Sequence, residues 1–304
     1  MLVDQTQDTA AAETLAALRP KSTLPVALLR FCAQQPLGAF GAAVIIFAVV
    51  AAVLAPMLAP YSPTAIEVAD KFTPPFSNSE QLLGTDELGR DVLSRLIFGA
   101  RISMSVGLLS VGIAISAGTL IGIFSAYSGG KTDLAIQRLV DTMMAFPAII
   151  MALALMAALG ASQTNVIVAL VVILLPGAVR VVRSQVLSIK EQDYTLAARA
   201  IGAGSTRVML RHILPNVMAT YIVLSTITLG YAIVVEASLS FLGVGIPPDI
   251  ASWGGMLNLG ATTYIDVSPW LSVFPGVTIA LIVFAVNLLG DSLRDVLDPR
   301  LRGR

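Results

Sequence analysis

The sequence predicts an all-α, polytopic membrane protein with six transmembrane helices. Hydrophobic residues make up 56% of the 304 residues and charged residues only 12%, about half of the charged fraction of a soluble domain. Uncharged apolar stretches of about 20 residues, long enough to cross a bilayer as helices, recur along the chain. The charges gather between these stretches, as expected for a chain whose main solvent is lipid.

The first span is expected at residues 37–60, which carry no charge. It follows a polar tail of residues 1–36 that lacks the apolar core of a cleavable signal peptide. The other five spans are expected at residues 102–127, 134–159, 165–182, 216–235 and 270–289. Pro147 should kink the third span, and Pro176 with Gly177 interrupts the fourth, because proline cannot continue the helical hydrogen bonds.

Residues 61–100 are expected to form an extracytoplasmic loop with an interfacial helix. Asp91 and Arg95 alternate there with Leu93, Leu96 and Ile97, a pattern typical of a short amphipathic helix on the membrane surface. The loop 238–269, before the last span, is rich in glycine, proline and aromatic residues. A re-entrant or surface helix is possible there, with Trp253 and Tyr264 as anchors at the membrane interface.

Two local pairings are predicted inside the spans. Gly118 and Gly122 in the second span form a GxxxG pair, which allows another helix to approach closely in lipid. Arg138 and Asp141 near one end of the third span are three residues apart on one helix face, which predicts a local ion pair.

The distribution of positive charge predicts the orientation. Of the 19 Lys and Arg residues, only Lys71, Arg90, Arg95 and Arg101 fall on the side opposite both termini. The positive-inside rule therefore places both termini and the loop 190–216 in the cytoplasm. The formal net charge is zero, which gives no electrostatic basis for binding nucleic acid.

The residues indicate no catalytic, cofactor or metal site, so we do not expect an enzyme. His212 is the only histidine, whereas metal sites usually recruit several ligands. The GGKT sequence of residues 129–132 lacks the first glycine of a phosphate-binding loop, because Ser125 stands at that position. Such a loop would also follow a strand, and here a membrane span precedes it.

Ionisable residues within or beside the spans lie near span ends. They are Asp141, Arg180, Glu236 and Asp291. An ion-coupled carrier usually has ionisable sites near the bilayer midplane, so this placement argues against a self-contained secondary transporter. Four polar residues are candidates for lining a pathway or, equally, for bonding between helices: Ser225, Thr226, Thr228 and Asn287.

A polar insert at residues 190–216 interrupts the apolar pattern. Its two blocks, at 194–201 and 206–213, are rich in residues that favour helix, and Gly202-Ala203-Gly204 between them lets the chain turn. We expect two short helices set at an angle, held at the membrane surface by the flanking spans. Such a loop is suited to being gripped by another protein.

Three stretches resemble one family. Ala197-Ala198, Gly202 and Leu214-Pro215 resemble the "EAA" loop of permease subunits of binding-protein-dependent ABC importers, although Leu196 replaces the acidic residue of the family and His212 replaces a common isoleucine. Glu191 or Asp193 is a candidate substitute for that acidic residue. Residues 84–103, GTDELGRDVLSRLIFGARIS, and 290–304, GDSLRDVLDPRLRGR, are similar to segments of the dipeptide, oligopeptide and nickel branch.

The resemblance implies the type I transmembrane fold of ABC importers, with a core of five helices at residues 101–291 and a C-terminal cytoplasmic tail at 292–304. It implies a second homologous permease, two ABC ATPase subunits that carry ATP and Mg, and an extracytoplasmic substrate-binding protein. Residues expected to couple to the ATPase are Asp193, Thr195, Ala197, Ala198, Gly202, Arg207, Arg211, Leu214 and Pro215. The expected cargo is di- or oligopeptide, with nickel, glutathione or another small solute as alternatives. A self-contained secondary transporter or channel is the alternative from another class.

Overall fold

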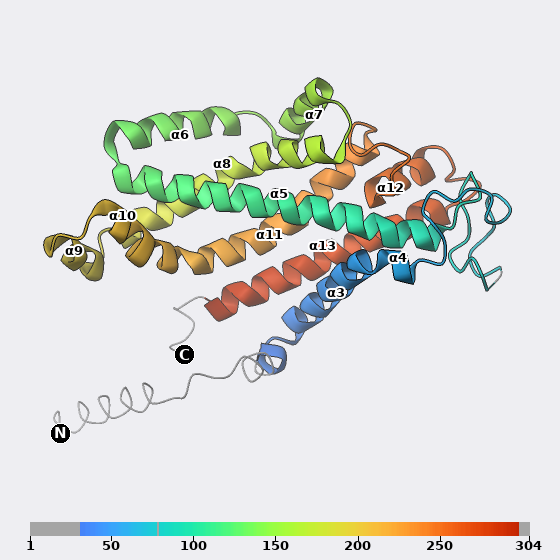
Figure 1. The fold of residues 1–304 in the computed structure, drawn as a ribbon, viewed down its shortest axis with the longest axis horizontal. Coiled ribbons are helices and arrows are strands. Elements are labelled where there is room, and N and C mark those ends of the chain that lie inside the picture. Colours follow the sequence, from blue (N-terminus) through green and yellow to red (C-terminus); the bar gives the residue numbers. More distant parts are fainter. Residues whose placement is uncertain (1–30, 78, 298–304) are drawn as a thin grey trace.

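The computed structural model describes residues 31–77 and 79–297, and the described chain is helical without a strand. Long helices run side by side, with the short helices α9 and α10 at one end of the molecule and α12 with the loop before α5 at the other (Figure 1). The helices are α3 (Pro36–Val53), α4 (Ala55–Leu58), α5 (Val92–Ser128), α6 (Gly130–Met144), α7 (Ala148–Leu159), α8 (Gln163–Ile189), α9 (Asp193–Ala200), α10 (Ser205–Val208), the π-helix η1 (Met209–Ile213), α11 (Leu214–Phe241), α12 (Trp253–Thr262) and α13 (Trp270–Leu297). Residues 1–30 and 298–304, which include most of both predicted tails, lie outside the described part.

Within the described residues, five helical segments are long and apolar enough to cross a membrane, and a sixth span is formed if α6 and α7 count together. These two helices meet at an angle of 86°. Pro147 caps α7, and a residue before proline is disfavoured in the helical region. The third span is therefore two helices joined at a sharp bend, whereas Pro176 lies inside α8 without ending it.

The close approach predicted for the second span is confirmed. A Cβ added to Gly118 would lie 2.5 Å from Cβ of Ala178, and one added to Gly122 would lie 2.9 Å from the carbonyl oxygen of Val179. Both neighbours belong to α8. The two glycines therefore let α5 and α8 pack at a distance that no larger residue allows.

The amphipathic surface helix expected around Asp91 and Arg95 is wrong. Residues 92–97 are the first turns of the 37-residue helix α5, and Asp91 caps it by accepting a hydrogen bond from the Ser94 amide at 2.7 Å. Arg95 is buried rather than solvated. The alternation of charged and apolar residues arises because loop 61–91 folds over this end of α5 and supplies polar partners.

Two side chains predicted at local or interfacial positions contact other helices, and a third, expected near a span end, is buried. Asp141 pairs with Arg180 of α8, not with Arg138 of its own helix. Trp253 is 1% exposed, and its Nε1 donates to the carbonyl oxygen of Leu96 at 3.0 Å, so it packs α12 on α5 instead of anchoring at a lipid interface. Glu236 is fully buried within α11, where its Oε1 accepts from Ser240 Oγ at 3.0 Å.

Candidate functional site

The segment between α8 and α11 forms a projection at one end of the bundle (Figure 1), as the polar insert predicts. Its base is fixed by buried groups. Thr195 is fully buried and its Oγ1 donates to the carbonyl oxygen of Ile189 at 3.0 Å. Val208 and Ile213 are also fully buried, in an apolar cluster with Val182 of α8. The projection is therefore a packed extension of the bundle.

Cations of the projection add contacts to the end of α5. The guanidinium of Arg199 lies over the ring of Tyr127, 5.0 Å from its centroid, a cation–π arrangement. Nζ of Lys190 donates to the carbonyl oxygen of Ala126 at 3.4 Å. These contacts join α9 and the end of α8 to a helix more than 60 residues earlier in the chain.

Gly202 ends α9 in a conformation that suits glycine. Its φ is +85°. The Ala203 amide donates to the carbonyl oxygen of Ala198 at 3.0 Å, and the Gly202 amide to that of Arg199 at 2.9 Å. This is the hydrogen-bond pattern of a Schellman motif, which favours glycine at the left-handed position. The turn between the two blocks of the insert thus has a defined geometry.

The second block differs from the separate helix that the sequence predicts. Residues of α10, η1 and α11 form one helical segment, Ser205–Phe241. Pro215 has no amide hydrogen to bond the carbonyl of Arg211 four residues earlier, and a π-helical turn, Met209–Ile213, occurs at this place. The end of the projection is therefore continuous with the span that follows it.

The outer surface of the projection carries apolar side chains among charges. Ile201 at the end of α9 is 86% exposed, and Tyr194, Leu196 and Leu210 are exposed as well. The expected coupling residues divide by burial, with Thr195 and Ala198 buried, Leu214 half-buried and the following six exposed: Asp193, Ala197, Gly202, Arg207, Arg211 and Pro215. Sequence reasoning missed the exposed position of Ile201, whose signal is a large apolar residue beside a glycine turn in a polar loop.

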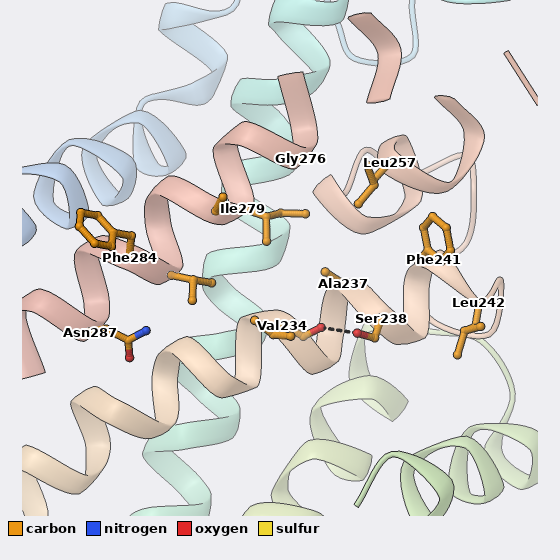
Figure 2. Close-up of a pocket in the computed structure, with 12 residues that line it drawn as sticks. Val234, Ala237, Ser238, Phe241, Leu242, Leu257, Gly276, Ile279, Phe284 and Asn287 are labelled. Atoms are coloured by element: carbon orange, nitrogen blue, oxygen red, sulfur yellow. Dashed lines mark hydrogen bonds between the residues drawn. The ribbon is translucent and has the colours of Figure 1, made fainter. Parts of the chain in front are cut away.

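Two grooves follow one side of α11. The distal groove, far from α9, has a volume of about 740 Å³ between α11, α12 and α13, and its wall includes Val234, Ser238, Phe241, Leu257, Ala280 and Asn287 (Figure 2). The proximal groove, nearer to α9, has a volume of about 450 Å³ between α8, α11 and α13, and its wall includes Gln185, Asn216, Thr220, Val223, Ile227 and Arg294. The α11 residues of both walls recur every three or four positions, so they lie on one face of that helix.

Of the four predicted pathway residues, only Asn287 is on the wall of either groove. Thr226 Oγ1 donates to the carbonyl oxygen of Ile222 in its own helix at 2.9 Å. Ser225 and Thr228 are half-buried and lie on neither wall. The face of α11 that lines the grooves therefore does not include Ser225, Thr226 or Thr228.

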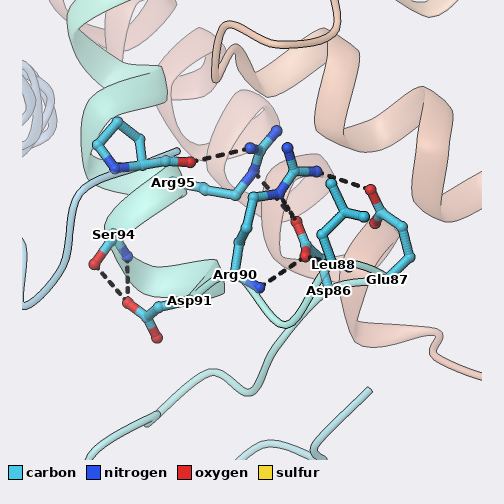
Figure 3. Close-up of polar contacts among 8 residues, drawn as sticks. Asp86, Glu87, Leu88, Arg90, Asp91, Ser94 and Arg95 are labelled. Carbon is cyan, nitrogen blue, oxygen red and sulfur yellow. Dashed lines mark hydrogen bonds and ion pairs between the residues drawn. The ribbon is translucent and has the colours of Figure 1, made fainter. Parts of the chain in front are cut away.

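At the distal end, a polar network fixes loop 61–91 to α5 (Figure 3). Asp86 accepts from Arg90 Nε at 2.6 Å, and its carboxylate lies 3.6 Å from Nε of Arg95. Arg95 Nη1 also donates to the carbonyl oxygen of Pro63 at 3.2 Å. Burial and the neighbouring Asp86 carboxylate raise the pKa of Glu87 above its ordinary value of 4.5. The network gives the distal end a defined shape.

The chain has several helices suited to span a membrane, and one of them, α11, both lines two grooves and continues into the packed projection. These features are those of a polytopic membrane transport protein. The chain belongs to the family described as "binding-protein-dependent transport system inner membrane component", which matches residues 118–303. Residues 26–75 match the "N-terminal TM domain of oligopeptide transport permease C". Family membership makes the chain a membrane permease subunit of ABC importers.

Three of its relatives are named as permease proteins for peptides or glutathione. The chain is 42% identical over 270 residues to the di/tripeptide transport system permease protein DppC of Pseudomonas aeruginosa, covering 87% of this chain and 89% of the relative. It is 37% identical over 278 residues to the oligopeptide transport system permease protein OppC of Bacillus subtilis, covering 91% and 89%. It is 40% identical over 225 residues to the glutathione transport system permease protein GsiD of Pectobacterium atrosepticum, covering 74% of each.

Proposed function

We propose that this chain forms half of the translocation pathway for di- and oligopeptides in an ATP-driven importer of the bacterial inner membrane. The cargo is supported by the names of the relatives, which include di/tripeptide and oligopeptide permeases. A second homologous permease supplies the other half of the pathway, and an extracytoplasmic binding protein delivers the peptide. Both termini and the projection lie in the cytoplasm, in agreement with the excess of Lys and Arg on that side.

The proposed ATPase contact is the outer surface of α9 and α10. The observation that carries it is the burial pattern of the projection, whose base is locked by Thr195 and Val208 while Ile201 at its tip is 86% exposed. Tyr194, Leu196 and Leu210 are also exposed on this projection, and several exposed apolar side chains on one rigid element are typical of a protein–protein contact. ATP and Mg are bound by the partner ATPase subunits, and this chain contributes no cofactor of its own.

The proposed coupling uses the continuous helix. Force on α9 passes through the fixed turn at Gly202 into Ser205–Phe241, a single helical segment. One face of that segment lines both grooves. A tilt or rotation imposed at the projection therefore changes the two grooves together, which is the requirement for switching a pathway between its two openings.

The test compares two exposed isoleucines outside the spans, Ile201 and Ile66, which are 86% and 61% exposed. Burying an isoleucine side chain at an interface contributes about 1.5–3 kcal/mol, so Ile201→Ser should weaken binding of the ATPase subunits about tenfold or more. Ile66→Ser, at the opposite end of the molecule, should leave that binding unchanged. The measurement is the amount of ATPase subunit that co-purifies with each permease variant in detergent.

Two further variants address coupling after assembly. Gly202→Pro removes the amide that donates a hydrogen bond at 2.9 Å, and proline cannot adopt the φ of +85° at this position. Replacing Arg207 and Arg211 by glutamate reverses the charge of two exposed positions on the projection. Both should insert normally but abolish peptide-stimulated ATP hydrolysis. Normal stimulation in both, or peptide import by this chain alone in liposomes, would overturn the proposal. Uptake of labelled nickel instead of labelled peptide would overturn the cargo.

A further inference from the structure

The distal groove combines apolar walls with one free amide. Of the residues on its wall, only Ser238 and Asn287 have polar side chains, and none is ionisable. Ser238 Oγ already donates to the carbonyl oxygen of Val234 at 2.8 Å (Figure 2). The exposed amide of Asn287 has no hydrogen-bond partner within residues 31–77 and 79–297, so its donors and its acceptor are available to a ligand.

These walls restrict what can occupy the groove. A charged side chain would lose its hydration without finding a counter-ion, which costs on the order of several kcal/mol. A lipid acyl chain would suit the walls but would leave the Asn287 amide unpaired. A peptide matches both features, since it carries apolar side chains on a backbone whose amides offer the donor and acceptor that an asparagine side chain pairs with. A volume of about 740 Å³ is within the range of small-molecule sites.

Asn287 lies where the distal groove approaches the proximal one. A Cβ added to Gly230 of α11 would lie 3.5 Å from Oδ1 of Asn287, so α11 passes the amide at a residue that has no side chain. Arg294 of the proximal groove is seven residues after Asn287 and thus on the same face of α13, two turns away. A peptide moving toward α9 would pass apolar walls, then the amide, and then a mixed wall that carries polar side chains and the cation of Arg294.

We propose that the distal groove is a transient subsite that takes an apolar side chain of the peptide cargo, while the amide of Asn287 bonds to the peptide backbone. The inference rests on the proposed function as a peptide permease and adds a selectivity step within the pathway. It makes the permease sensitive to the size of the cargo's side chains after the binding protein has released the peptide.

The first test narrows the groove and compares two peptides. Ala280 is an exposed wall residue of α13, and Ala135 is an exposed residue of α6 on neither groove. In the complete importer reconstituted in proteoliposomes, Ala280→Phe should lower the import rate of trileucine at least about fivefold more than that of trialanine, because only the larger side chain needs the space. Ala135→Phe should leave the ratio of the two rates unchanged.

The second variant removes the amide at nearly constant volume. Asn287→Leu should lower the import rates of trileucine and trialanine alike, about two- to tenfold, as for loss of one neutral hydrogen bond, because both peptides have the same backbone. Unchanged import rates in Asn287→Leu, or an equal decrease in the import rates of both peptides in Ala280→Phe, would show that the groove does not bind the peptide as proposed.

A labelling experiment identifies the occupant directly. Cys32 is the only cysteine of the chain, so Cys32→Ser combined with Ala280→Cys gives one thiol, on the groove wall. During turnover, trileucine should slow labelling of that thiol by a water-soluble maleimide at least about threefold. Labelling only by a membrane-soluble maleimide would show that lipid fills the groove. Absence of labelling even without peptide would show that the second permease covers the groove. Either result overturns the proposed subsite. If the wild-type complex imports trialanine, the proposed function stands whatever the groove does, whereas failure to import any peptide overturns both.

Discussion

Replacing Gly118 by alanine tests the packing of α5 on α8, with Gly112 of the same helix as its control. A Cβ at position 118 would lie 2.5 Å from Cβ of Ala178 and 3.2 Å from two backbone atoms of α8. A Cβ at position 112 would meet nothing within 4 Å. The two substitutions are chemically identical and differ only in what the added methyl group contacts.

The expected free energies of unfolding follow from these contacts. Alanine in a helix interior is favoured over glycine by about 0.5–1 kcal/mol, and Gly112→Ala should show this gain. Overpacking of a filled site costs about 1–3 kcal/mol, so Gly118→Ala should be less stable than Gly112→Ala by about that amount. Adding Ala178→Gly removes the atom at 2.5 Å but leaves the backbone contacts at 3.2 Å, so the double variant should recover part of the loss.

The assay is reversible unfolding of the purified chain in mixed detergent micelles, titrated with sodium dodecyl sulfate. A double-mutant cycle over Gly118 and Ala178 gives their interaction energy. Equal stability of Gly118→Ala and Gly112→Ala would refute the close approach of α5 and α8. Absence of any coupling between positions 118 and 178 would show that the two helices meet through other residues.

Three further outcomes are expected. Thr195→Val removes a fully buried hydrogen bond of 3.0 Å. It should destabilise the projection by about 1 kcal/mol and speed hydrogen exchange of the amides in α9. Thr206→Val, at an exposed position, should have neither effect. Asp133 accepts a hydrogen bond from Arg183 Nε at 2.7 Å, and a double-mutant cycle should give an interaction energy of about 1 kcal/mol for this partly exposed pair. Exchanging the two residues should restore the lost stability. An interaction energy near zero would exclude a stabilising pair. Because burial raises the pKa of Glu87, its contribution to stability is complete below pH 4.5 and declines as the pH rises above that value. Glu87→Gln should therefore remove this part of the pH dependence of thermal unfolding. A pH profile unchanged by the substitution would contradict the raised pKa.

The sequence determined the apolar segments, the close approach of another helix at Gly118 and Gly122, and the position of the projection. These features depend on hydropathy and residue type within one stretch of chain, because a span needs only enough apolar residues and a close approach only small ones. The Gly202 turn was predictable for the same reason, since its left-handed backbone requires glycine locally.

Only the tertiary structure decided which side chains meet. Asp141 pairs with Arg180 of another helix, Arg95 is buried under a loop that begins some 30 residues earlier, and Asn287 rather than Thr226 lines a groove. Such partners are fixed by the rotation of each helix about its axis and by the contacts between distant segments. These quantities arise from the packing of the whole bundle, and no single stretch of sequence contains them.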